Sequence, residues 1–128
     1  GGQLGGQLIK SLKANFQNIK IMAVGTNATA TAAMLKAGAD QAATGENPVM
    51  VACRKTDVII GPIGIVIADS LLGEVTERMA LAVARSEAVR ILIPMNKCEN
   101  LVAGVPNLNV GALIADAVAK VSNIIAQA

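Results

Sequence analysis

The stretch VIIGPIG, residues 58–64, carries the clearest fold signal in the chain. Its first three residues form an apolar block without polar alternation, and a Gly-Pro-Ile-Gly turn follows directly. Strands that are covered by helices on both faces have this composition, because neither side of such a strand meets water. The stretch therefore predicts a buried strand of a parallel sheet, followed by the kind of glycine turn from which open α/β sheets build ligand sites.

Upstream of this stretch, the sequence predicts three helices and two strands. The run 19–24 predicts a strand that ends at Gly25, the Ala/Thr segment 28–37 predicts a helix closed by Gly38, and 40–44 predicts a small strand. Before them, five apolar residues recur at the spacing of one helix face: Leu4, Leu8, Ile9, Leu12 and Phe16. A further helix is expected to start with Asn47 as its cap and Pro48 as its first residue, and to run to about residue 55.

Downstream, the same alternation continues. A short helix is expected over 65–72, and Thr76 is expected to cap another that runs to about residue 86, with an apolar side made of Met79, Leu81, Val83 and Ala84. Residues 89–93 predict a strand that stops at Pro94. Asn109 is expected to cap a terminal helix whose apolar residues are Leu113, Ile114, Val118, Val121 and Ile125.

Alternating helices and strands of this spacing indicate parallel βαβ crossovers. We predict a single α/β domain over residues 1–128, with a three-layer, doubly wound, Rossmann-like and mostly parallel sheet. A short edge strand at Asn100–Ala103 is expected to be antiparallel to the rest. The Gly-rich start, read as a loop, leads into a helix, and such a turn normally follows a buried strand; we therefore expect a first strand upstream of Gly1.

Composition argues against several classes of protein. Hydrophobic residues make up 53% of the chain, but they lie in short blocks. The longest block, 58–68, is interrupted by Gly and Pro and is shorter than the roughly 18 residues that a membrane helix needs, so no membrane span is expected. A net charge of +2 and a single aromatic residue, Phe16, argue against a nucleic-acid partner.

The cysteine and histidine content argues against a metal site. Cys53 and Cys98 lie far apart, and the chain has no His, so neither a zinc site nor a redox disulfide is predicted. Reduced thiols and the lack of a signal-peptide pattern lead us to expect a cytoplasmic protein.

The first candidate ligand site is the opening Gly1-Gly2-Gln3-Leu4-Gly5. Its Gly2-x-x-Gly5 spacing matches the last two glycines of G-x-G-x-x-G, in which backbone approaches a pyrophosphate at the start of a helix. The alternative is a tight turn that needs glycine only for its backbone angles.

The second candidate is Gly25-Thr26-Asn27, at the end of the second strand of the expected sheet. In dinucleotide-binding folds an acidic residue at this place holds the ribose hydroxyls. No acid is present here, which argues against ordinary NAD binding, although Thr26 and Asn27 can hydrogen-bond a ribose or a 2'-phosphate. The alternative is that Asn27 simply caps the following helix.

The third candidate is Gly61-Pro62-Ile63-Gly64, where backbone with apolar neighbours suits a flat ring. The alternative is a rigid turn between strand and helix. Asp69, Ser70 and Glu74 are candidates to supply carboxylates or a hydroxyl near this loop, or to form a solvated helix end.

A possible reactive pair lies after the strand at 89–93. Lys97 and Cys98 are candidates for a cation and a nucleophile, but without a His the thiol has no evident base, and a packing role is the alternative. With no Tyr in the chain, a Tyr-x-x-x-Lys reductase site is excluded, and no catalytic residue is assigned.

Several longer stretches resemble a small bacterial family, domain of unknown function 3842. They are the Gly-rich start, 24–31, 34–40, 43–47, 61–65, 72–74 and 91–96. The resemblance implies a Rossmann-like nucleotide-binding shape without an established substrate. Members of that family typically begin with a strand and a fuller Val-Ile-Asp-Gly-Gln-Gly-Gly motif, which implies that Gly1 and Gly2 continue a turn.

Three functional hypotheses stay open. The leading one is a binding protein that holds NAD(P) or another nucleotide across the three glycine loops. The second is a small oxidoreductase or transferase that uses Lys97, Cys98 or Asp69 in a site shared between subunits. The third is an interaction module in which the Ala-rich helices 28–37 and 80–84 pack on another copy in a homodimer.

Overall fold

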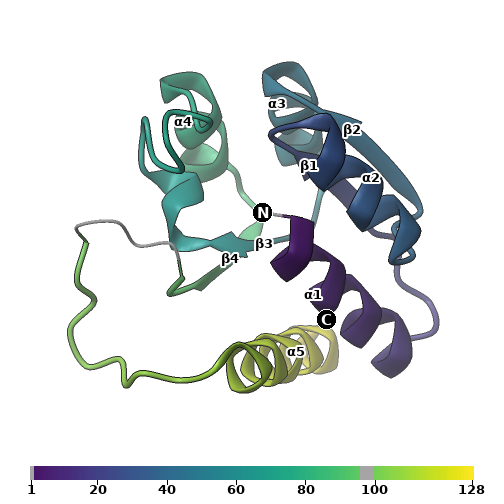
Figure 1. Ribbon diagram of the computed structural model, residues 1–128. Helices are drawn as coiled ribbons and strands as arrows, with labels where there is room; N and C mark the ends of the chain where they lie inside the picture. The colour runs from purple at the N-terminus through teal and green to yellow at the C-terminus, as the bar shows by residue number, and fades with distance from the viewer. Residues whose placement is uncertain (1, 96–99) are drawn as a thin grey trace.

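The computed structural model describes residues 2–95 and 100–128 and shows an α/β protein (Figure 1). Within these ranges, helices and strands alternate as predicted. In chain order the elements are α1 (Gly2–Asn15), β1 (Met22–Gly25), α2 (Ala28–Lys36), β2 (Gln41–Thr44), α3 (Glu46–Lys55), β3 (Val58–Pro62), the 3-10 turn η1 (Ile63–Val66), α4 (Glu77–Arg85), β4 (Val89–Ile93) and α5 (Val110–Gln127).

The described strands form two parallel pairs. β1 pairs with β2, with Met22 opposite Gln41, and β3 pairs with β4, with Val58 opposite Val89. The expected parallel pairing is thus confirmed within each pair, while the described strands form two two-stranded sheets. The predicted edge strand at Asn100–Ala103 is wrong, because this segment is irregular and the Leu101 side chain is 93% exposed instead of packing on a sheet.

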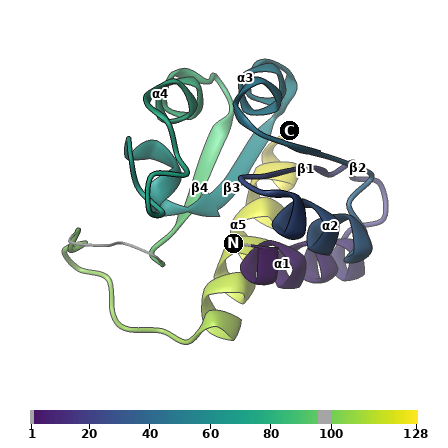
Figure 2. The same ribbon diagram turned by 45° about the horizontal axis from the view of Figure 1, so that its top comes forward.

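The helices lie on both sides of the strand pairs (Figure 2). α1, α2 and α5 lie together on one side, and α3 and α4 lie together on the other. The larger core cluster joins the Leu4, Leu8 and Leu12 face of α1 to Ile91 and Ile93 of β4 and to α5. A smaller cluster joins Ile9 of α1 to Ala23 of β1 and Met34 of α2. The predicted apolar face of the first helix is thus confirmed, and α1 packs against both strand pairs.

The expectation that the chain opens as a loop is wrong, because Gly2 to Gly6 already lie in α1. Leu4 is buried with Leu8 and Leu12, so the helical repeat begins within the Gly-rich segment. A Cβ atom on Gly5 would lie 2.6 Å from the Met34 Sδ atom, so glycine here permits the close approach of α1 to α2. Gly1 lies outside the described residues.

Three predicted helix caps are confirmed. The side chains of Asn27, Thr76 and Asn109 each accept a hydrogen bond from the backbone N–H three residues later. These bonds satisfy amides that have no partner within the helix.

The start of α3 differs from the prediction. Gly45, at φ +109°, occupies the cap position and Glu46 begins the helix, so Asn47 and Pro48 lie inside its first turn. Proline is tolerated there because first-turn N–H groups have no intrahelical acceptor.

The segment after β3 also differs from the prediction. Only the short turn η1 forms where a helix over 65–72 was expected, because Asp69, Leu71 and Leu72 have positive φ angles of 65°, 55° and 56°. In α4, Met79 and Val83 are buried as predicted, but Leu81 is 47% exposed and Ala84 is exposed as well.

Among the helices of the described ranges, α5 alone has the length and apolar composition of a membrane-crossing helix. The core helix of a soluble protein has the same properties, and four residues of α5 belong to the larger core cluster: Leu113, Ile114, Ala117 and Val121.

Candidate functional site

The loops that follow β1, η1 and β2 meet at the carboxyl end of the strands. Asn27, directly after β1, accepts a hydrogen bond at Oδ1 from the N–H of Ala30, at 2.9 Å. Its Nδ2 atom donates to Oε2 of Glu74, at 3.2 Å. The predicted capping role of Asn27 is therefore confirmed, and the same side chain also holds a carboxylate that lies 47 residues away in the sequence.

Glu74 supplies an acid at the end of β1, where the local sequence has none. It is presented by a tight turn in which the N–H of Asp69 donates to the Val75 carbonyl, at 2.7 Å, and the N–H of Val75 donates to the Ser70 carbonyl. Non-glycine residues rarely adopt the left-handed conformation found at Asp69, Leu71 and Leu72, at a cost of about 1–3 kcal/mol each. The hydroxyl of the buried Ser70 donates to the Gly64 carbonyl and ties the turn to η1.

Hydroxyl groups and the carboxylate of Glu46 make further contacts in the neighbouring elements. The Thr31 and Thr44 hydroxyl oxygens are 2.7 Å apart and join α2 to the end of β2. Glu46, at the start of α3, accepts a hydrogen bond from the Thr76 hydroxyl and pairs with Arg78, at 3.5 Å. Glu74 is exposed and has no ion pair to any residue that the structure describes. Its carboxylate thus keeps acceptor capacity for a ligand.

The glycines of the second and third loops are in close contact with the chain itself. A Cβ atom on Gly25 would lie 2.3 Å from the Thr31 Oγ1 atom and 2.8 Å from its backbone nitrogen. A Cβ atom on Gly61 would lie 2.8 Å from Cδ1 of Ile65. The face of Gly61 on which we expected a flat ring therefore carries the Ile65 side chain.

The structure does not bring the first candidate site together as a loop. Gln3 is exposed on α1, Leu4 is a core residue, and Gly5 packs on Met34. What remains of that site at the surface is the first turn of α1, on the side of the strands where α2 lies (Figure 2).

The residues of the enzymatic hypothesis receive no support from the structure. Lys97 and Cys98 lie outside the described residues, and Asp69 is exposed within the tight turn. Burial raises the pKa of the Cys53 thiol, which disfavours the reactive thiolate. In residues 2–95 and 100–128 no group of three or more His, Cys, Asp and Glu residues could hold a metal ion.

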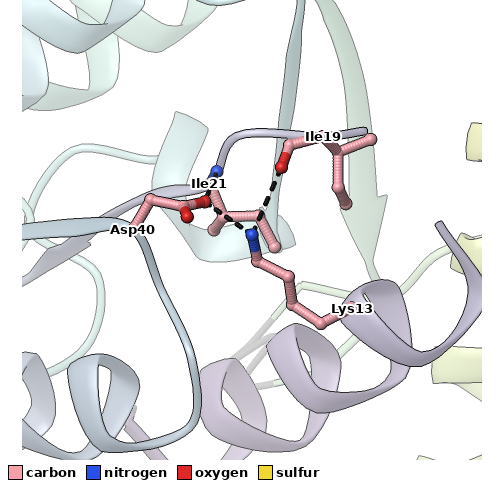
Figure 3. Close-up of polar contacts among 4 residues, drawn as sticks. All are labelled: Lys13, Ile19, Ile21 and Asp40. Atoms are coloured by element: carbon pink, nitrogen blue, oxygen red, sulfur yellow. Dashed lines mark hydrogen bonds and ion pairs between the residues drawn. The ribbon is translucent and has the colours of Figure 1, made fainter. Parts of the chain in front are cut away.

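A second carboxylate, Asp40, lies at the opposite end of the strands (Figure 3). Its Oδ2 atom accepts hydrogen bonds from Lys13 Nζ, at 2.6 Å, and from the N–H of Ile21, at 2.7 Å. Lys13 also donates to the Ile19 carbonyl, at 3.2 Å. The hydrogen bond from Lys13, and then that from Ile21, lowers the pKa of Asp40. This cluster ties α1 to the loops before β1 and β2.

Two surface grooves lie away from the candidate loops. One, of about 780 Å³, runs between α3 and α4 and is lined by Arg54, Lys55 and Arg85. The other, of about 380 Å³, lies between β4 and α5. Neither is lined by residues of the three glycine loops.

Sequence reasoning placed Glu74 near the third loop and missed its contact with the second. It also missed Thr31, Thr44 and Glu46. The ends of β1 and β2 are marked by Gly25 and Gly45, and this signal could have directed attention to the hydroxyl groups beside them.

The chain was also compared with known proteins. The family model described as "Domain of unknown function (DUF3842)" matches residues 1–126. No curated protein and no solved structure matches the chain.

Proposed function

We propose that this chain, which belongs to the family of domain of unknown function DUF3842, binds a nucleotide at the carboxyl end of β1. The observation that carries the proposal is the contact between Asn27 and Glu74, which places an amide and a carboxylate together where β1 ends. Ribose hydroxyls are donors that a carboxylate accepts, and in dinucleotide-binding folds an acid at this position performs that task.

The exposure and the hydrogen bonding of Glu74 support this role. Among the described residues, its carboxylate accepts a hydrogen bond only from Asn27, at 3.2 Å, and it is exposed, so its oxygens keep free lone pairs. A 2'-phosphate would bring a second negative charge to this carboxylate. We therefore favour nucleotides with a free 2'-hydroxyl, such as NAD or ATP, over NADP.

The phosphates would lie near the first turn of α1. Amides in the first turn of a helix have no intrahelical acceptor, and together with the helix dipole they favour an anion. Gln3 is exposed at this turn. In this arrangement the glycines have a structural role in the backbone, and polar side chains contact the ligand.

Calorimetric titration with NAD, NADP and ATP tests the proposal. Wild-type protein is compared with Glu74→Gln and with Glu87→Gln, a matched control just before β4 and thus at the other end of the strands. We expect binding of NAD or ATP, and a loss of about tenfold to a hundredfold in affinity for Glu74→Gln, since hydrogen bonds to charged groups contribute about 1.5–3 kcal/mol.

Glu87→Gln is expected to bind as the wild type does. Lack of binding to wild-type protein at millimolar nucleotide would contradict the proposal. So would equal affinities of wild type and Glu74→Gln.

A further inference from the structure

The surface groove of about 780 Å³ between α3 and α4, the α3–α4 groove, lies away from the nucleotide site. The two helices lie side by side in both views (Figures 1 and 2). Asp57 and Ala88 line the groove and directly precede β3 and β4, so it lies at the amino end of these strands. Small ligands of open α/β sheets bind at the carboxyl ends. A ligand of another class is therefore expected in this groove.

Hydrogen bonds between the ends of the two helices fix the shape of the groove. The Ser86 hydroxyl, after α4, donates to the Cys53 carbonyl of α3, at 2.7 Å. The same hydroxyl accepts from the N–H of Ala88, at 3.1 Å. Cys53 and Ala88 are both buried. The groove is thus preformed, and a preformed surface binds at a lower cost in conformational entropy than one that must be ordered.

Two apolar side chains line the groove, one from each helix. Leu81 is 47% exposed, although Met79 and Val83 of the same helix are buried in the protein. Met50 of α3 is half-buried in the same lining. The groove therefore offers apolar area that a partner can remove from water.

Three exposed cations accompany these apolar residues: Arg54 and Lys55 at the end of α3, and Arg85 at the end of α4. None of their side chains has an ion pair or a hydrogen bond to another residue of 2–95 or 100–128. Cations in the last turn of a helix interact favourably with the helix dipole. That interaction leaves their N–H groups unused, so they can still donate to the carboxylates of a partner.

The remaining features of the groove favour a peptide over a nucleic acid. Asp57 and Glu87 also line it, and neither carboxylate has an ion pair in the described part of the chain. A continuous phosphate backbone would meet both of them. The single aromatic residue of the chain, Phe16, packs against the larger core cluster and gives the groove no platform for base stacking.

We propose that the α3–α4 groove binds an acidic amphipathic helix of a partner protein. The apolar residues of that helix pack on Met50 and Leu81. Its carboxylates pair with Arg54, Lys55 and Arg85. Hydrophobic grooves take such helices through apolar anchors at positions i, i+3, i+4 and i+7, and arginine is enriched at protein interfaces. The inference does not depend on nucleotide binding, because the nucleotide site lies at the other end of the strands.

Fluorescence anisotropy with a labelled peptide of Glu and Leu tests the proposal. Its leucines stand at positions i, i+3, i+4 and i+7, and a second peptide has Gln in place of every Glu. We expect wild-type protein to bind the Glu peptide at least about tenfold more tightly than the Gln peptide. The affinity for the Glu peptide is expected to fall as the salt concentration rises, because salt screens exposed charges.

Two variants of the groove and one control locate the site. Arg54→Gln/Arg85→Gln is expected to weaken binding of the Glu peptide about threefold to tenfold, as loss of two exposed ion pairs does. Leu81→Ala is expected to weaken it about tenfold through lost apolar contact. Lys10→Gln/Lys36→Gln removes the same charge from α1 and α2, on the other side of the strands, and is expected to bind as the wild type does.

No binding of the Glu peptide at millimolar concentration, or equal binding of the two peptides, would overturn the proposal. So would an Arg54→Gln/Arg85→Gln variant that loses stability to urea and keeps its peptide affinity, because the cations would then serve only the helix dipoles. Tighter binding of a mixed-sequence single-stranded RNA at this groove would assign it to nucleic acid. Self-association that this variant abolishes would assign it to a second copy, and either result would also overturn the proposal.

Discussion

Two carboxylates lie at opposite ends of the β1–β2 pair, and they differ in their hydrogen bonds. Asp40 accepts from Lys13 at 2.6 Å and from the Ile21 N–H at 2.7 Å. Within residues 2–95 and 100–128, the Glu74 carboxylate accepts from the Asn27 amide alone, at 3.2 Å. A carboxylate that is held by a cation and by the main chain is part of the scaffold. One with a single long contact to a neutral amide keeps the acceptor capacity that a ligand needs.

The largest expected effect is a loss of stability from a substitution at Gly25, at the carboxyl end of β1. We expect Gly25→Ala to lower the free energy of unfolding by about 2–3 kcal/mol, because its Cβ atom would overlap the Thr31 backbone as well as its hydroxyl. Urea denaturation measures the change.

Gly6→Ala is the control for this substitution. A Cβ atom there would lie 3.6 Å from the Ala37 Cβ, an ordinary contact, and alanine in a helix is favoured over glycine by about 1 kcal/mol. We therefore expect Gly6→Ala to be slightly stabilising. If Gly25→Ala is as stable as the wild type, the close packing of Gly25 on Thr31 does not stabilise the carboxyl end of β1.

A smaller effect is expected for Asp40→Asn, and it depends on pH. The pKa of Asp40 in the folded protein lies below its ordinary value of 3.8. Its contribution to stability is therefore complete above that ordinary value and is lost as the pH falls through the lowered pKa. Wild-type protein should lose more stability than Asp40→Asn between pH 6 and pH about 2.5.

Urea denaturation at a series of pH values measures this difference. Asp116→Asn removes an exposed carboxylate that pairs with Lys120 on α5, and it serves as the matched control. If Asp40→Asn and wild type lose the same stability as the pH falls, the Asp40 carboxylate does not stabilise the fold.

The smallest expected effect is that of Glu74→Gln on folding. Its Asn27 contact is long and exposed, and a glutamine oxygen can accept the same hydrogen bond, so we expect a change within about 0.5 kcal/mol. Thermal denaturation without nucleotide measures it. A marked loss of stability would assign Glu74 to the scaffold beside Asp40 and remove the contrast between them.

Features set by local sequence were predictable. The strand at 89–93 and the caps at Asn27, Thr76 and Asn109 each depend on neighbouring residues, and the structure confirms them. The assignment of Gly2 and Gly5 to a loop was wrong, because both lie in α1, where Gly5 permits the close approach of α2. This contact involves Met34 on another helix, so the spacing of the glycines does not predict it.

The contact of Glu74 with Asn27 was not predictable for a different reason. It requires the chain to turn back after η1 through left-handed conformations at Asp69, Leu71 and Leu72, which these residue types seldom adopt. The division of the strands into two pairs also has no local signal, since each strand has the composition of a buried inner strand.

The most direct test of nucleotide binding at Glu74 is an NMR titration of the wild-type protein with NAD, followed through its backbone amides. We predict saturable chemical-shift changes for the amides of Gly25 to Ala28 and of Glu74, while the amide shifts of Ile21 and Asp40 stay unchanged. Shifts confined to Ile21 and Asp40, or no shift at millimolar NAD, would contradict this prediction.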